Sequence, residues 1–171
     1  AAPAESVTAI IIGRMTDSTP VANAGAAPLN HLGVIRITGA DAANFIHNQL
    51  TQDFLLLPPQ NARLAAFCSA KGRMQASFVV LKTAPDTVLL VMERDLLAQT
   101  LKRLSMFVLR AKVKLSDASA QWQWRGLLSS SARARLGDAA PWHTVSSDSA
   151  HVVALYPAVL GEQRVPRAIW L

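Results

Sequence analysis

The chain has 171 residues, of which 51% are hydrophobic, so it can bury the core of one full domain or of two small ones without disulfides. The 17 Lys and Arg residues exceed the 11 Asp and Glu residues and give a net charge of +6, which favours anionic partners such as nucleic acid, a membrane surface or a polycarboxylate ligand. One cysteine, Cys68, excludes an internal disulfide and fits a reducing compartment, and we expect a cytoplasmic protein.

Motifs exclude several further classes. No apolar run approaches the roughly 18 residues of a membrane span. The histidines and Cys68 form no pair at the spacing H-x3-H or C-x2-C, so the sequence predicts no metal site. The patterns G-x-S-x-G, G-x-x-x-x-G-K-[ST], G-x-G-x-x-G and H-E-x-x-H are absent, and local motifs do not indicate an enzyme.

Residues 1–29 read as a disordered tail or linker. The stretch 16–28 is rich in Ser, Thr, Pro, Ala, Asn and Gly and has nothing that could form a core. The sequence from Met15 onward is typical of a natural bacterial amino terminus. We therefore expect residues 1–14 to be an upstream extension.

A first unit is expected over residues 30–117, and it begins with a strand and a short helix. "HLGVIRITG" supplies β-branched residues and ends at a Gly turn signal, which predicts a strand. "ADAANFIHNQL" offers Asp41 as a cap and places Phe45 and Leu50 at helical spacing. "TQDFLLLPPQ" then predicts a loop that ends at two prolines.

A three-stranded antiparallel meander follows. Its strands are "ARLAAFCSA", "MQASFVVLKTA" and "TVLLVME", and the first turn lies at Lys71 and Gly72. A helix is then predicted from Leu97, Leu101, Leu104 and Val108, whose apolar stripe should cover one face of the sheet. Alternation in "KVKLSDAS" predicts an edge strand that ends the unit.

A second unit is expected over residues 118–171. "QWQWRGLLS" predicts a strand with Trp122 and Trp124 on one face, where paired indoles are more often core than a ligand platform. "SSSARARLG" predicts a Ser-capped helix with a Gly stop. Strands are expected at "WHTVSS", "HVVALYP" and "RAIWL", and we expect the natural protein to continue beyond Leu171.

Three segments carry a family resemblance. "LGVIRITGADAANFIHNQLTQDF", "ARLAAFCSAKGRMQASFVVL" and "LKRLSMFVLRAKVKLSDAS" resemble, in this order and spacing, the amino-terminal part of the YgfZ-type folate-binding proteins, relatives of the glycine cleavage T-protein. The resemblance covers residues 30–171. It implies an α+β fold of two subdomains, each an antiparallel sheet covered by helices, with the first inserted into a discontinuous second and a carboxyl-terminal barrel domain missing.

The resemblance also implies a function. A YgfZ-like protein would bind tetrahydrofolate or a one-carbon derivative and would assist the assembly or repair of iron–sulfur clusters in client enzymes, including tRNA-modifying ones. Its partners would be folate and iron–sulfur client or assembly proteins. One alternative is a folate-dependent aminomethyltransferase, and a second is an RNA-binding module suggested by the positive charge. The resemblance leaves open whether the chain is an enzyme and favours a role without catalysis.

Two departures from the T-protein pattern matter. Gln75 and Ala76 stand where T-proteins carry acids on the strand after the hairpin, so no carboxylate is present there as a general base. The Lys-Gly-Cys-type motif of the YgfZ branch is not reached within the chain, and Cys68 does not match it. The sequence therefore assigns no catalytic residue.

The predicted cofactor-binding residues come from the two motif segments. Lys71, Gly72 and Arg73 either form a purely structural turn or also border a pocket for a pterin or its glutamate tail. The "HNQLTQD" segment either satisfies backbone donors at the helix exit or lines the same pocket. The full predicted set is Gln49, Thr51, Asp53, Ser69, Lys71, Gly72, Arg73 and Gln75. Cys68 is expected to be a small core residue.

Overall fold

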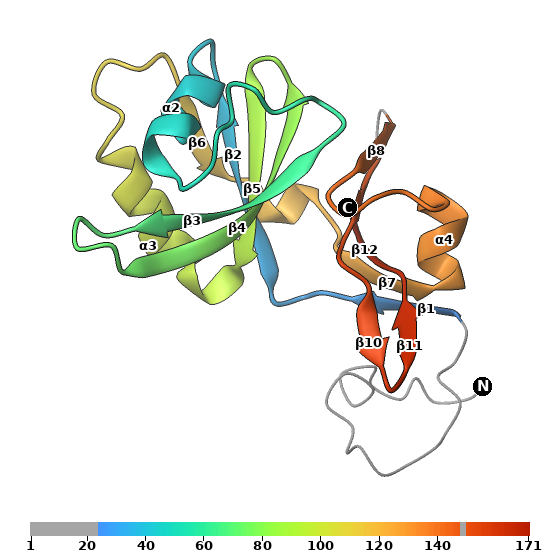
Figure 1. The fold of residues 1–171 in the computed structure, drawn as a ribbon. Helices are drawn as coiled ribbons and strands as arrows, with labels where there is room; N and C mark the ends of the chain where they lie inside the picture. The colour runs from blue at the N-terminus through green and yellow to red at the C-terminus, as the bar shows by residue number, and fades with distance from the viewer. Residues whose placement is uncertain (1–23, 148–149) are drawn as a thin grey trace.

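The structure is a computed structural model, and it describes residues 24–147 and 150–171. Its helices and strands form four layers: α2 and α3, a first sheet, a second sheet, and α4 (Figure 1). The expected tail over residues 1–23 lies outside the described residues. No helix of the described part of the chain is long and apolar enough to cross a membrane.

The first sheet has the strand order β3-β4-β5-β2-β6 and is antiparallel throughout. Its strands are β2 Leu32–Thr38, β3 Ala62–Cys68, β4 Met74–Ala84, β5 Thr87–Glu93 and β6 Lys114–Asp117. The helices α2 Ala42–Gln49 and α3 Arg94–Ser105 cover one face of this sheet (Figure 1). The predicted meander is thus confirmed as β3, β4 and β5.

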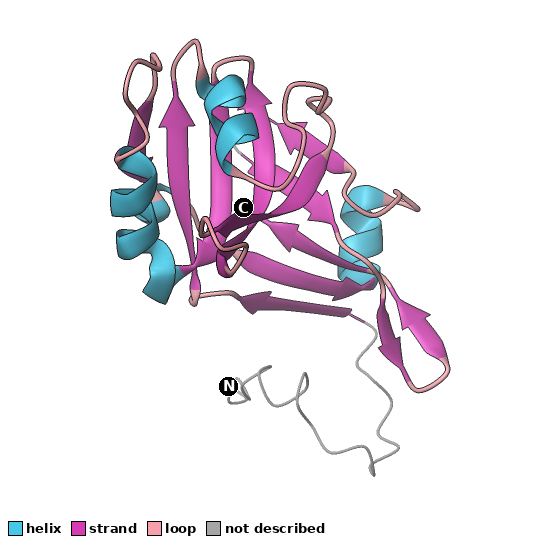
Figure 2. Ribbon diagram, turned by 60° about the vertical axis from the view of Figure 1, so that its left-hand side comes forward, coloured by secondary structure: helices cyan, strands magenta, loops and turns pink. Residues whose placement is uncertain are grey.

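The second sheet has the order β1-β7-β12-β9-β8 and is also antiparallel. Its strands are β1 Ala24–Pro28, β7 Arg125–Ser129, β8 Thr144–Ser147, β9 Ala150–Ala154 and β12 Arg167–Trp170. The helix α4 Ser130–Leu136 packs on its outer face. The hairpin of β10 Ala158–Leu160 and β11 Gln163–Val165 projects away from both sheets (Figure 2).

Alternation along the strands builds two cores from the first sheet. On β2, Ile35 and Ile37 point towards α2 and α3, where Leu97 and Leu104 of α3 complete the core as the apolar stripe predicted. Val34 points the other way, into a second core shared with the second sheet. This second core holds the two sheets face to face.

Both tryptophans of "QWQW" belong to the core between the sheets. Trp124 is 4% exposed, and the half-buried Trp122 packs against the same cluster, so both contribute to the core, while Trp122 also borders a second pocket. The predicted strand at this position was wrong in its start. The short 3-10 helix η1 Ser119–Gln121 precedes Trp122, and β7 begins at Arg125.

Other local expectations were wrong for physical reasons. Residues 24–28 form β1, because backbone hydrogen bonds to β7 give a strand even to the small residues AGAAP. The Asp41 carboxylate makes no cap hydrogen bond and instead accepts one from the backbone N–H of Lys112 at 2.7 Å. Helix α4 has no side-chain cap bond from Ser129, whose φ is +55°. Helix α3 ends at Ser105, before Val108.

Candidate functional site

The two motif segments meet at the exit of α2. Leu50 forms an isolated β-bridge with Phe67, so the end of the helix lies against β3. The Thr51 backbone N–H donates to the Ala66 carbonyl at 3.1 Å, and the Ala66 N–H donates to the Thr51 hydroxyl oxygen at 2.9 Å. Thr51 therefore joins "HNQLTQD" to the hairpin strand, while Gln49 lies half-buried at the end of α2.

Asp53 organises the loop that follows. Its Oδ1 accepts hydrogen bonds from the backbone N–H groups of Leu55 at 2.9 Å and Leu56 at 3.1 Å. His47 Nδ1 lies 3.4 Å from the same oxygen. The Leu56 N–H, with further help from Leu55 and His47, holds the pKa of the Asp53 carboxyl below its usual value. These contacts give Asp53 a local structural role, as an Asx-type turn.

The corner between β3 and β4 is a tight turn with exposed basic side chains. The Ser69 N–H donates to the Arg73 carbonyl at 2.8 Å, and the Gly72 N–H donates to the Ser69 carbonyl at 2.9 Å. The Arg73 N–H also donates to the Ser69 hydroxyl at 3.2 Å. Gly72 has φ +75° and open space where a Cβ would stand, so the left-handed backbone, and not close packing, favours glycine.

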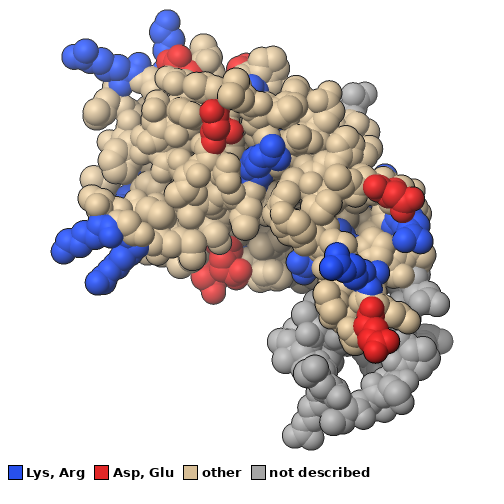
Figure 3. Space-filling view, in the orientation of Figure 1, with Lys and Arg blue, Asp and Glu red and all other residues tan. Residues whose placement is uncertain are grey.

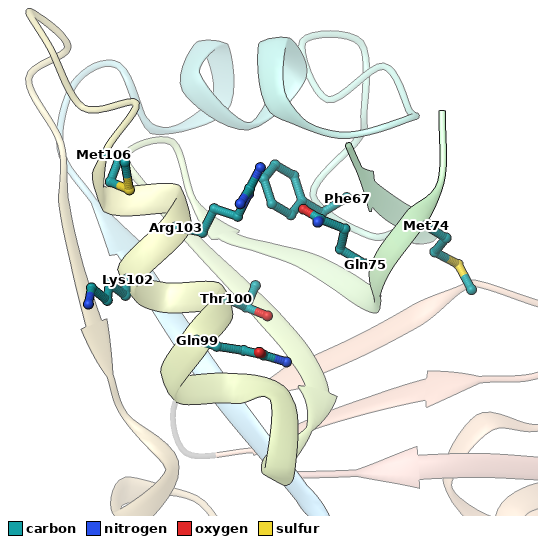
Figure 4. A pocket seen from close by; sticks show the side chains of 8 residues that line it. All are labelled: Phe67, Met74, Gln75, Gln99, Thr100, Lys102, Arg103 and Met106. Atoms are coloured by element: carbon teal, nitrogen blue, oxygen red, sulfur yellow. The ribbon is translucent and has the colours of Figure 1, made fainter. Parts of the chain in front are cut away.

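A pocket of about 540 Å³ lies between β4 and α3. Gln75 and Arg103 point into it towards the Phe67 ring, whereas Lys102 and Met74 point away at its margins (Figure 4). The lining residues are Phe67, Met74, Gln75, Gln99, Thr100, Lys102, Arg103 and Met106. Of the eight predicted site residues, Gln75 lines this pocket and the other seven do not.

Half of the lining residues lie on α3, and none of these four, Gln99, Thr100, Lys102 and Arg103, is among the predicted site residues. Gln99 and Arg103 are spaced by four residues, which puts them on one face of the helix, and Met106 follows at the C-cap. The apolar stripe of α3 is the dominant signal in this stretch, and clustered Lys and Arg residues beside such a stripe are more often a solvated helix face than a binding site. A search for amide and guanidinium groups at helical spacing, opposite Gln75, could have found them.

The lining chemistry suits a planar, amide-bearing anion. Gln75 and Gln99 can donate to and accept from the edge of a heterocycle, while the Arg103 guanidinium can bind a carboxylate through two N–H groups. Phe67 supplies an aromatic wall. No Asp or Glu lines the pocket, and no group of three His, Cys, Asp or Glu side chains in the described residues could hold a metal ion.

Two face-to-face antiparallel sheets with helices outside them define an α+β fold, and a pocket lies between one of these helices and the first sheet. The family model "GCVT N-terminal domain" matches residues 19–165, and the chain belongs to this family. The fold expected from the resemblance, a T-protein-like α+β arrangement, is thereby confirmed.

Three proteins illustrate the relationship. An uncharacterised protein of Haemophilus influenzae is 29% identical over 100 residues, covering 58% of this chain and 35% of its own length. The mitochondrial iron–sulfur cluster assembly factor IBA57 homolog of Aspergillus oryzae is 32% identical over 116 residues, covering 58% and 26%. The structure of glycine cleavage system aminomethyltransferase T from Bartonella henselae superposes with TM-score 0.70 and 14% identity, covering 88% of this chain and 42% of that one.

The last similarity describes the fold alone. This chain spans about a third or less of the curated relatives described above. Similarity over this part of the relatives does not distinguish the YgfZ branch, which the resemblance indicates, from other branches of the family.

Proposed function

We propose that the chain is the amino-terminal, folate-binding part of a YgfZ-like accessory protein for iron–sulfur cluster assembly or repair. The observation that carries the proposal is the pocket between β4 and α3, in a chain of the GCVT N-terminal domain family. Similarity to an iron–sulfur cluster assembly factor over more than half of this chain supports the accessory role. The expected clients include tRNA-modifying enzymes in the cytoplasm.

The size and the chemistry of the pocket support tetrahydrofolate as its ligand. Its volume of about 540 Å³ lies within the usual range for small-molecule sites. Gln75 and Gln99 would bind the amide edge of the pterin, Phe67 would pack on a ring, and Arg103 would bind a carboxylate of the glutamate tail. Lys71 and Arg73, exposed at the neighbouring turn, would add long-range attraction for the dianionic tail.

Titration calorimetry with tetrahydrofolate under anaerobic conditions tests the site. We expect Gln75→Ala to weaken binding about tenfold, the loss that one or two hydrogen bonds to a ligand can cause. Gln163→Ala, at an exposed glutamine of the projecting β10–β11 hairpin, is the matched control and should bind as the unmodified chain does. Equal affinity of both variants would remove Gln75 from the site.

The basic turn is tested separately. Lys71→Ala combined with Arg73→Ala should weaken folate binding, while the free energy of unfolding changes by no more than about 0.5 kcal/mol because both side chains are exposed. The loss should shrink at high salt, since it is electrostatic. An unchanged affinity at low salt would reduce this corner to a structural turn.

The accessory role makes a prediction for cells. Deletion of the gene should lower the activity of iron–sulfur enzymes under oxidative stress, and the unmodified gene should restore it while a Gln75→Ala gene restores it only in part. Fully active cluster enzymes in the deletion strain would contradict the role, even if folate binds.

Aminomethyl transfer is the second candidate, because the fold is shared with an aminomethyltransferase. That chemistry needs a group that manages protons on the folate nitrogen, and such a group contributes typically 10² to 10⁴ in rate. Gln75 is an amide, Ala76 is 3% exposed, and no carboxylate lines the pocket. We therefore expect no methylenetetrahydrofolate from an aminomethylated carrier protein, and turnover at the rate of an authentic T-protein would favour the enzyme.

A further inference from the structure

The end of α3 and the turn after it combine positive charge with exposed apolar side chains. Residues 102–110, "KRLSMFVLR", contain the exposed cations Lys102, Arg103 and Arg110. Among them stand three apolar side chains with large exposed fractions: Met106 at 70%, Phe107 at 46% and Leu109 at 86%. We name these six residues the α3-end surface.

The charge of this surface is not compensated along the chain. Between Asp95 and Asp117, and again between Asp53 and Asp86, the sequence contains no Asp or Glu. Figure 3 shows Lys and Arg side chains projecting over the β3–β4 turn and over the connection that follows α3.

Nearby acids of the described chain are engaged elsewhere. Asp41 of the α2 start accepts a hydrogen bond from the backbone N–H of Lys112. The described ion pairs are His47 with Asp53 and Arg133 with Asp138, so no cation of the α3-end surface has an acidic partner among the described residues. The surface can therefore offer its full charge to a partner.

The surface is held in place and is partly concave. Successive backbone N–H groups from Met106 to Leu109 donate to carbonyls two or three residues earlier, which fixes the turn. Lys102, Arg103 and Met106 border the pocket beside β4, and the Phe107 ring meets the Phe67 ring edge-on at 6.3 Å. Met106 thus borders the hollow, whereas Phe107 and Leu109 stand outside it on the turn that follows α3.

We propose that the α3-end surface docks an acidic, amphipathic segment of a partner protein. Carboxylates of the segment would pair with Lys102 and Arg110, which the folate proposal leaves unassigned, and its apolar side chains would cover Met106, Phe107 and Leu109. Exposed apolar side chains grouped in this way mark interaction sites, and methionine adapts its shape to a partner. An acidic segment with apolar residues at helical spacing matches both the charge and the apolar side chains of the surface.

Two other polyanions match the charge but not the shape. A lipid bilayer is flat and favours apolar side chains in one plane, whereas Met106 lines a hollow. Single-stranded nucleic acid uses stacked aromatic rings, and here one ring, Phe107, is already in edge contact with Phe67. A protein segment can extend from the hollow beside Met106 to Leu109 and Arg110 on the turn that follows α3.

Selection from a displayed library of random peptides against the full chain tests the proposal. We expect the selected peptides to be rich in Asp and Glu, with apolar residues at i and i+4, and to bind more weakly as salt rises. The double variant Leu109→Ser with Arg110→Glu should weaken their binding about tenfold or more. Neither residue lines the folate pocket, so folate affinity should stay unchanged.

A matched control keeps the result interpretable. Val159→Ser with Arg164→Glu makes the same kinds of change at exposed residues of the β10–β11 hairpin and should leave peptide binding intact. The proposal would be overturned if the selected peptides showed no acidic bias, or if both double variants lost peptide affinity equally. It would also be overturned if the chain bound single-stranded RNA or phosphatidylserine vesicles more tightly than the peptides and only the α3-end variant lost that binding. Folate binding is measured in the same preparations, so a failure of the folate proposal can be distinguished from a failure of the docking proposal.

Discussion

Removal of one buried hydroxyl should weaken the joint between the first sheet and η1. The Val34 backbone N–H donates to the Ser119 hydroxyl at 3.0 Å, and this hydroxyl donates to Asp117 Oδ1 at 2.6 Å. Val34 is fully buried and Ser119 is 9% exposed. In Ser119→Ala the Val34 N–H loses its acceptor where water does not reach it.

The size of the expected loss in the free energy of unfolding follows from the unpaired Val34 N–H. A buried N–H left without a partner costs about 1–3 kcal/mol, a large share of the roughly 5–15 kcal/mol that holds a typical domain folded. For a chain of this size the midpoint of thermal unfolding should fall by about 2–12 °C. Urea unfolding should show the same loss with an unchanged slope, because the surface exposed on unfolding is the same.

A second serine provides the control. Ser105 is exposed at the end of α3 and donates its hydroxyl to the Leu101 carbonyl at 2.8 Å. Since alanine is the better helix former, Ser105→Ala should change the free energy of unfolding by less than about 0.5 kcal/mol. If Ser119→Ala also changed the free energy of unfolding by less than about 0.5 kcal/mol, the hydrogen bond to Val34 would not contribute to the stability of the joint.

Three more outcomes are expected. Gly39→Ala should unfold at markedly lower urea concentration, because φ is +130° and the new Cβ would stand 2.0 Å from a backbone carbonyl oxygen of the connection before β6. Phe54 is 1% exposed, so Phe54→Ala should lower the free energy of unfolding, measured by heat or urea, by about 3–5 kcal/mol. Leu56 lies in the same loop but is 82% exposed, so Leu56→Ala should change this free energy little. Hydrogen bonds from Ser119 hold the pKa of Asp117 below its ordinary value, so the free energy of unfolding should fall as the pH drops below about 4. Ser119→Ala should lose less free energy of unfolding on acidification than the unmodified chain. An equal loss in both proteins would count against this explanation.

The fold was most predictable where local and global preferences agree. Alternating and β-branched residues predicted β4 and β5, and the spacing of Leu97 and Leu104 predicted α3 and its covered face. β1 was missed because AGAAP carries no strand signal, and its strand character comes from pairing with β7 far along the chain. The β10–β11 hairpin, with Gly161 at φ +60°, was likewise not anticipated.

The candidate site was predicted only in part, for a similar reason. Gln75 was selected from its place after the hairpin, and it lines the pocket. Thr51 and Asp53 were selected from their motif, and the structure uses them in hydrogen bonds to the neighbouring backbone. Arg103 belongs to neither motif, and the packing of α3 over the first sheet brings it to the pocket that Gln75 also lines. Motif position alone does not distinguish a side chain that organises a turn from one that faces a ligand.

The pairing of β1 with β7 constrains the order of events during synthesis. Residues 24–28 leave the ribosome about 100 residues before their partner, residues 125–129. At roughly 5–20 residues per second, β1 waits on the order of 5–20 s without its ladder, while every strand of the first sheet has already been made. The first sheet can therefore assemble on the nascent chain, whereas β1 has no partner until β7 emerges, and the second sheet is complete only after β12, at residues 167–170, joins β7 to β9.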